Sequence, residues 1–120
     1  MNVNVAQLST VLVQEKSAYD VALPAQADTN VIERVQSIHA TLIHVVAQSS
    51  VAGQLKLRLY SANGQLSELV ALGSLSAATT ASFSYGDSAN EAIGQRYDVV
   101  FEPGSTPSGD TITAWTAARA

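Results

Sequence analysis

Histidine is the side chain best suited to proton transfer at neutral pH and to metal binding, and this chain contains two, His39 and His44. A hydrolytic histidine needs a nucleophile and an acid beside it, and a zinc-binding histidine needs further ligands. The two residues are five positions apart, so an extended strand would point them to opposite faces of a sheet. The spacing therefore predicts one partly buried and one surface histidine.

Paired carboxylates could hydrolyse a glycosidic bond, and Asp98 and Glu102 are the clearest pair. They share a strand face with Val100 in "RYDVVFE" (96–102), which predicts a solvated outer face. Serine is abundant, but no Gly-x-Ser-x-Gly motif places one on a strained turn. We therefore expect a non-enzymatic protein with no catalytic residue, no metal site and no cofactor.

One loop could hold calcium through oxygen ligands. The segment "GDSANEA" (86–92) brings Asp87, Asn90 and Glu91 together. Its residues do not follow the EF-hand spacing, and Asp and Asn commonly stabilise plain turns. An ordinary turn is the prediction here.

Charge and hydropathy exclude two classes of partner. The chain has 6 basic and 10 acidic residues, a net charge of −4 and only 13% charged residues. The basic residues are scattered apart from Lys56 and Arg58, whereas nucleic-acid binding needs them clustered. No apolar run of about 18 residues predicts a membrane span, and no signal-peptide pattern is present. We expect no nucleic-acid or membrane partner, and synthesis in a host cytoplasm without disulfides, because cysteine is absent.

Alternating apolar residues predict β structure through most of the chain. In "LKLRLYSANGQLSEL" (55–69), three leucines alternate with polar residues, and Asn63-Gly64 is typical of a hairpin turn. Similar runs recur every 8–15 residues. The prediction is an all-β fold, a jelly-roll-like β-sandwich of about 8–9 short antiparallel strands in a single domain, 1–120. Residues 1–14 would form either its first strand or an N-terminal arm.

The longest apolar stretch has two interpretations. From Val31 to Val46 the apolar residues fit a helical spacing, but alternation fits as well and β-branched residues favour a strand. We predict a strand over 36–47, and a short helical turn near 29–34 stays open. The predicted core is Val5, Val11, Val13, Val21, Leu23, Ile38, Ala40, Leu42, Val46, Leu55, Leu57, Leu59, Leu69, Leu72, Phe83, Tyr85, Tyr97, Val99, Phe101, Ile112 and Ala114.

The single tryptophan, Trp115, has the opposite parity to Ile112 and Ala114. If those two face the core, Trp115 faces outward, where it could serve as an interface anchor or a sugar-stacking platform. The opposite phase would bury it, and both phases stay open. With Tyr60, which is out of phase with the core leucines, and Arg119, it makes up the set of interface candidates.

Part of the chain resembles a known family. Residues 37–69 are similar to one stretch of the proprotein-convertase P-domain jelly roll, with Gln54 in place of the family's acidic residue and Ala62 in place of its turn proline. The matching residues are His44, Leu55, Leu57, Leu59, Ser61, Asn63, Gly64 and Leu69. The resemblance implies a β-sandwich topology and no activity.

The whole chain resembles tailed-phage virion proteins in style, as a small, cysteine-free all-β chain rich in Ala, Ser, Thr, Val and Gln. The resemblance is to capsid decoration (cement) proteins, and it implies a virion subunit that joins capsomers, often as a trimer, with an N-terminal strand or arm on the shell. We therefore expect a structural viral-particle subunit that forms homo-oligomers and binds other virion proteins. The alternative is a carbohydrate-binding β-sandwich module with Trp115 and Tyr60 as platforms.

Overall fold

A computed structural model describes residues 11–61, 63–86 and 94–120. The elements are β1 (Leu12–Ala22), β2 (Thr29–Gln36), β3 (Leu42–Ser49), β4 (Gly53–Tyr60), β5 (Ser67–Leu75), β6 (Ala81–Gly86), β7 (Arg96–Pro103) and β8 (Thr111–Arg119). The described residues form no helix, and so none that could cross a membrane. The predicted all-β fold is confirmed.

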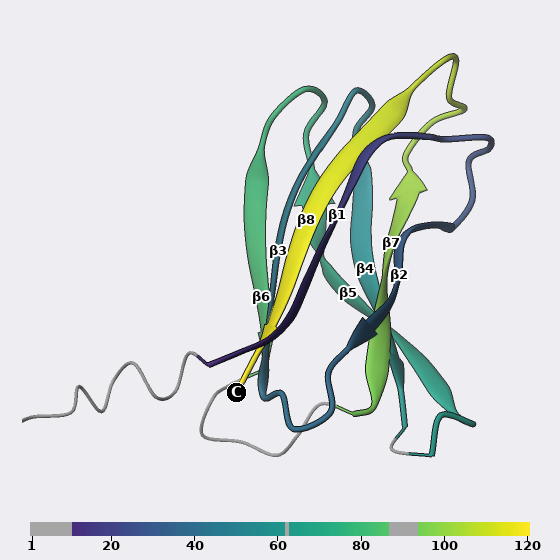
Figure 1. The fold of residues 1–120 in the computed structure, drawn as a ribbon. Coiled ribbons are helices and arrows are strands. Elements are labelled where there is room, and N and C mark those ends of the chain that lie inside the picture. The colour runs from purple at the N-terminus through teal and green to yellow at the C-terminus, as the bar shows by residue number, and fades with distance from the viewer. Residues whose placement is uncertain (1–10, 62, 87–93) are drawn as a thin grey trace, which may run out of the picture.

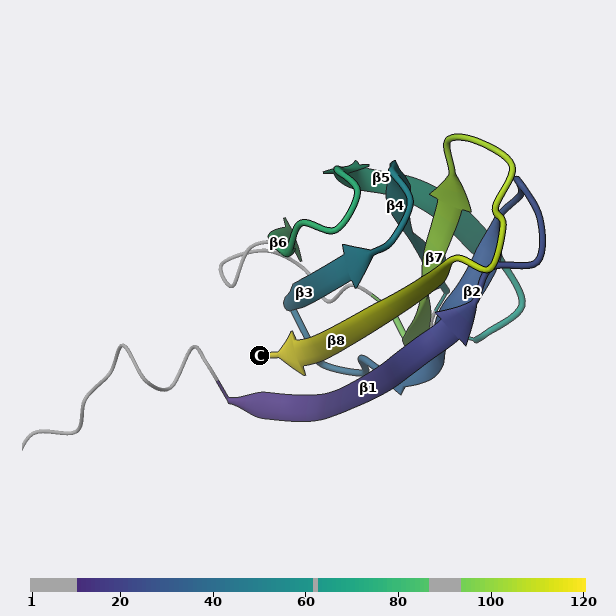
Figure 2. The ribbon, with the colours of Figure 1, turned by 90° about the horizontal axis from the view of Figure 1, so that it is seen from above.

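The strands form two antiparallel sheets of four, packed face to face (Figures 1 and 2). Sheet A has the order β1-β8-β3-β6, and sheet B has the order β2-β7-β4-β5. Inward side chains of both sheets make one core, because successive residues of a strand point to opposite faces. Its largest fully buried members include Tyr97, Phe101, Ile43, Leu55 and Leu57. This architecture is the predicted β-sandwich.

The apolar stretch 31–47 contains parts of two strands. The strand predicted over 36–47 is confirmed over 42–47, in β3, but 37–41 is a turn, and residues 29–34, where a helical turn stayed open, belong to β2. A tight turn over 37–41 separates β2 from β3, with the Ala40 N–H donating to the Ser37 carbonyl at 2.8 Å. His39 lies in this turn with φ of 67°, the left-handed region. Residues 37–41, which alternation assigns to the strand, form the turn. The residues of β3 that face the core are therefore the odd-numbered ones from Ile43, and not the predicted even-numbered ones.

This phase shift in β3 explains two of the errors in the predicted core. In β3 the buried residues are Ile43, Val45 and Ala47, whereas Leu42 and Val46 are half-buried on the outer face. Three other predicted core residues are exposed: Val11, Ile38 and Leu69. Val5 lies outside the described residues. In β4, β7 and β8 the predicted core residues Leu55, Leu57, Tyr97, Val99, Phe101, Ile112 and Ala114 are buried, and Leu59 is half-buried against them.

The two edge strands β1 and β2 each contain a bulge. Register breaks occur between Ala18 and Val21 and between Ile32 and Val35. At each break one residue has positive φ, Asp20 at 49° and Arg34 at 57°. A bulge inserts one residue into a strand and reverses which face the following side chains occupy. Both strands therefore depart from simple alternation at their middle.

Side chains of β1 join it to β2 at this edge of the sandwich. Lys16 has inward parity, opposite Thr116, and its Nζ donates to the carbonyls of Glu33 and Arg34 at 3.0 and 3.1 Å. The Gln14 amide oxygen accepts a hydrogen bond from the backbone N–H of Gln36. The two sheets are thus linked by side-chain to backbone hydrogen bonds along the β1–β2 side.

Candidate functional site

Trp115 lies on the outer face of sheet A. Its strand neighbours Ile112 and Ala114 are buried in the core, so the indole is on the opposite side. The indole Nε1 donates to a carboxylate oxygen of Glu15 at 3.0 Å. The His44 ring meets it edge-on, with centroids 5.8 Å apart and planes at 69°. These two contacts fix the orientation of the tryptophan ring on the sheet.

A groove of about 270 Å³ runs beside this tryptophan. Its lining is apolar and neutral polar, from Ser17, Tyr19, Val46, Ala47, Gln48, Thr80, Thr113, Ala114 and Trp115. Tyr19 is 76% exposed, the most exposed large apolar or aromatic side chain among the described residues. Simple alternation would place it on the same face as Val21, and the bulge at Asp20 reverses this. No glycine or other residue pattern marks this bulge, so alternation alone does not identify Tyr19 as a groove residue.

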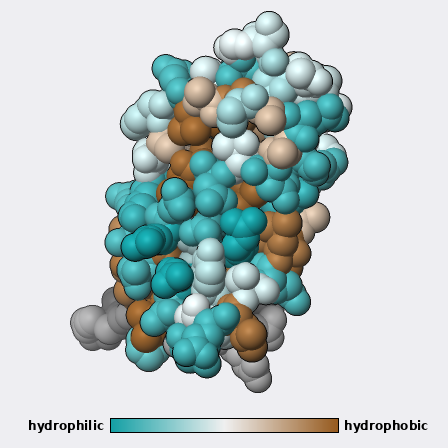
Figure 3. Space-filling view, turned by 90° about the vertical axis from the view of Figure 1, so that its right-hand side faces the viewer, coloured by the Kyte–Doolittle hydropathy of each residue, from teal (hydrophilic) through white to brown (hydrophobic). Residues whose placement is uncertain are grey.

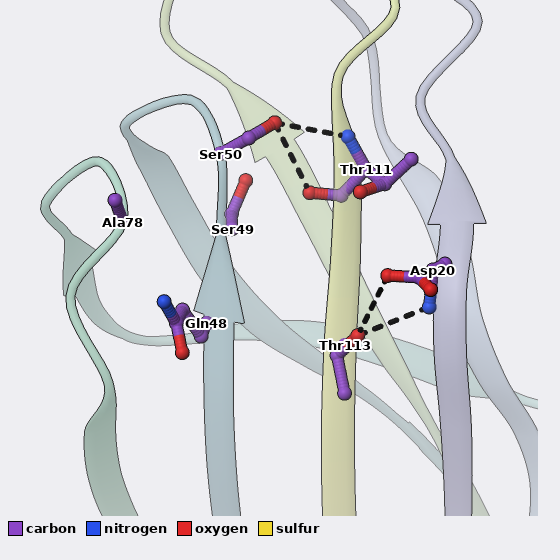
Figure 4. A pocket seen from close by; sticks show the side chains of 7 residues that line it. All are labelled: Asp20, Gln48, Ser49, Ser50, Ala78, Thr111 and Thr113. Atoms are coloured by element: carbon purple, nitrogen blue, oxygen red, sulfur yellow. Dashed lines mark hydrogen bonds between the residues drawn. The ribbon is translucent and has the colours of Figure 1, made fainter.

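A second, more polar pocket of about 300 Å³ lies at the end of sheet A where β3 ends and β8 begins (Figure 4). In Figure 4, Asp20 and Thr113 face each other from neighbouring strands, and the Thr113 hydroxyl accepts the Asp20 N–H at 3.0 Å. The Ser50 hydroxyl donates to Asp110 at 2.8 Å. Hydrogen bonds from the Ser108 N–H and from Ser50 lower the pKa of the Asp110 carboxyl. The polar groups of this pocket thus bind one another and hold strand ends together.

Asp98 is buried on the outward-facing side of β7, so the predicted solvated position is wrong. It is 3% exposed, and its two carboxylate oxygens accept the Arg34 N–H and the Tyr60 hydroxyl, each at 2.9 Å. The Arg58 guanidinium lies 3.8 Å away. The Arg34 N–H belongs to the bulge of β2, so this carboxylate satisfies a backbone donor that the bulge removes from the ladder.

Long basic side chains cover the same strand. Lys56 Nζ lies 2.9 Å from both Asp28 and Glu102, and these hydrogen bonds, with that to Glu102 the stronger, raise the pKa of Lys56. Lys56 is opposite Val100 in the register and reaches across β7 to Asp28, and Arg58 reaches across to Asn30 at 2.9 Å. Val100, which faces the same side as these two basic residues, has no exposed surface.

These long side chains make the outer face of sheet B hydrophilic. Figure 3, seen from the side on which β2 and β7 lie, shows hydrophilic residues across the middle of this face. Among the described residues no group of three His, Asp or Glu side chains is placed to hold a metal ion. The carboxylates Asp98 and Glu102 are joined to cations and donors of neighbouring strands, and this arrangement stabilises sheet B.

The three interface candidates lie apart. Tyr60 is on the outer face of sheet B, with the Arg96 guanidinium 4.4 Å from its ring centroid and its hydroxyl bonded to Asp98. Trp115 is on the outer face of sheet A. Arg119 ends β8, opposite Leu12 and Leu42 in the register. The structure therefore does not bring Tyr60 and Trp115 into one site.

Four of the six exposed large apolar or aromatic side chains among the described residues lie at one end of the sandwich, which we call the apolar end. It is defined by Val11, Leu12, Ile38 and Leu66, which are 51%, 45%, 53% and 72% exposed. They lie where β1 begins, in the β2–β3 turn and in the β4–β5 turn, all at the lower end in Figure 1. Arg119 is at the same end. The loop 86–92, considered for calcium, falls outside the described residues beyond Gly86.

No protein-family model and no curated protein matches the sequence. Solved structures share the fold. PBSX exported protein XepA superposes with a TM-score of 0.66 at 14% identity, covering 94% of this chain and 38% of XepA. The chain thus spans less than half the length of XepA. Two further structures have lower TM-scores. AlgX of Pseudomonas aeruginosa has a TM-score of 0.49 at 19% identity, covering 91% of this chain and 27% of AlgX. SPBc2 prophage-derived protein YomS has a TM-score of 0.47 at 17% identity, covering 88% of this chain and 93% of YomS.

Proposed function

We propose that this chain is a structural, non-enzymatic subunit of a viral particle, of the capsid-decoration type, and that it binds other copies of itself through its apolar end. The observation that carries the proposal is that Val11, Leu12, Ile38 and Leu66 are all exposed at the same end of the sandwich. Exposed large apolar side chains favour association, because apolar area leaves water when proteins bind each other.

Two further observations support a structural role. The charged side chains of sheet B are bonded to each other across strands, so they hold the fold rigid. The fold likeness to XepA, which is described as a PBSX exported protein, covers nearly the whole chain and supports a protein that works outside the cell that makes it. Arg119, beside the apolar end, would lie at the polar rim of the contact.

Replacing Ile38 with aspartate is expected to weaken self-association by roughly 10- to 100-fold, because a buried isoleucine contributes roughly 1.5–3 kcal/mol and a buried unpaired carboxylate opposes association. Ile38 lies in a turn and is 53% exposed, so the fold itself should tolerate the change. Leu66→Asp at the same end should act in the same way. Sedimentation velocity over a concentration series would measure the effect.

The matched control is Thr106→Asp, which adds the same charge to an exposed loop at the opposite end. It should associate as the unmodified protein does. Co-sedimentation with assembled particles would test the position on a shell. If the unmodified protein stays monomeric at millimolar concentration and does not sediment with particles, the proposal is wrong.

A further inference from the structure

We propose that the groove beside Trp115 on the outer face of sheet A is a binding site for a neutral saccharide, with the indole as the stacking platform. The groove lies on a sheet face, away from the apolar end, so the inference is independent of the proposed assembly role.

The platform is held in place before any ligand arrives. Glu15 accepts the indole N–H at 3.0 Å, and the His44 ring contacts the indole edge-on. His44 is in turn 3.3 Å from the Ser84 hydroxyl through Nδ1. These residues come from all four strands of sheet A. A ring fixed in this way loses little conformational entropy on binding, which is the advantage of a preorganised site.

A second aromatic side chain points into the same groove. Tyr19 is 76% exposed, and it follows Ser17, the register partner of Trp115. Tyr19 shares the outer face with Ser17 by simple alternation, and the bulge at Asp20 returns the chain to the core at Val21 while Tyr19 stays outside. A tyrosine left in water this way is available to a partner. Two aromatic rings on neighbouring strands, with Val46 on the third, form an apolar floor onto which the C–H face of a sugar ring can pack.

The remaining lining matches the hydroxyl groups of a sugar. Around the apolar floor lie the neutral polar residues Ser17, Gln48, Thr80 and Thr113, and the lining contains no charged side chain. The Thr80 hydroxyl donates to the Gln48 amide oxygen at 2.9 Å, and Thr113 accepts the Asp20 N–H, so the Gln48 amide N–H groups and the Ser17 hydroxyl are the groups proposed to meet the sugar hydroxyls. An anionic ligand would need a cation here, so a neutral saccharide fits better than a phosphate, a sulfated glycan or a nucleotide. The volume of about 270 Å³ is just below the usual range of small-ligand sites, which suits a short saccharide segment.

Fluorescence gives a direct test, because Trp115 is the single tryptophan of the chain. We would titrate the full chain with cellohexaose, laminarihexaose and chitohexaose, and with a heparin-derived hexasaccharide as the anionic comparison. A saturable change with a neutral probe is expected, and none with the anionic one. Tyr19→Ala should weaken binding by about 10-fold and Trp115→Ala by roughly 30-fold or more, the size of effect found at binding hot spots. Binding by the tryptophan variant would be followed by NMR titration.

Ile38→Asp is the matched control, because it alters the apolar end and leaves the groove intact. It should bind the saccharide as the unmodified protein does, so that loss of assembly and loss of sugar binding are separate outcomes. Circular dichroism and thermal melting would show that each variant is folded. The inference is overturned if no neutral probe gives a saturable response, if Tyr19→Ala binds normally, or if only an apolar peptide occupies the groove.

Discussion

Asp98→Ala is expected to lower the free energy of unfolding by about 3 kcal/mol, because it removes a carboxylate that is buried and multiply bonded. The variant leaves the Arg34 N–H and the Tyr60 hydroxyl without their acceptor, and Arg58 without its nearest buried anion. Chemical denaturation at neutral pH would measure the loss.

Two comparison variants make this prediction specific. Asp98→Asn keeps one carbonyl oxygen as acceptor and should lose less than the alanine variant. Glu102→Ala removes a carboxylate of the same strand face whose side chain is 43% exposed, and the loss should be below about 1 kcal/mol. If Asp98→Ala and Glu102→Ala destabilise the protein equally, the buried acceptor does not have the role assigned to it.

The second large effect is expected at the hydrogen bond between the Tyr97 and Thr116 hydroxyls, 2.6 Å apart in the core. Thr116 donates its proton to the His44 carbonyl at 2.9 Å, so Tyr97 donates to Thr116. Thr116→Val strands a buried tyrosine hydroxyl and should lower the free energy of unfolding by about 2 kcal/mol, whereas Tyr97→Phe should lower it by about 1 kcal/mol. The double variant should lose less than the sum, because the tyrosine hydroxyl that Thr116→Val leaves without a partner is absent from it. Additive losses in denaturation experiments would contradict this.

The same tyrosine should make stability fall in alkali. Burial raises the pKa of Tyr97 to about 12, from 10.0 for an unperturbed tyrosine. Between these values the unfolded chain releases a proton that the folded protein keeps, so unfolding becomes easier as pH rises. The unmodified protein should lose stability relative to Tyr97→Phe by about 1.4 kcal/mol per pH unit in this window, and not below pH 10. Parallel slopes for the two proteins from pH 10 to 12 would exclude the effect.

The alternation of apolar residues predicted the sheets well where strands are regular. In β8 an unbroken rhythm from Ile112 onward gives the correct inward residues and leaves Trp115 outside. In β1 the same reasoning fails after Ala18, because the bulge at Asp20 has no signature such as glycine. A positive φ at an aspartate is set by tertiary contacts, including the hydrogen bond from its N–H to Thr113.

For the site residues, alternation predicts the face of the sheet better than it predicts burial and hydrogen-bond partners. Asp98 does point away from the core, as its parity requires, but outward is not the same as solvated. Its cover comes from Arg58 and Tyr60, which are about 40 residues earlier in the chain and adjacent only through strand pairing. The residues next to Asp98 in the sequence do not indicate which strand will pair with β7. Tyr60 was treated as a free platform for the same reason, although Asp98 and Arg96 already engage it.

The inward-pointing Lys16 protects one edge of the sandwich from pairing with a strand of another molecule. Exposed carbonyls at a sheet edge can template a strand from another molecule, which is the first step toward fibres. At the β2 edge, the lysine occupies the carbonyls of Glu33 and Arg34. A neighbouring molecule arriving there meets an ammonium group instead of an open hydrogen-bonding row. Copies of the sandwich can then lie close together without their sheets pairing along this border.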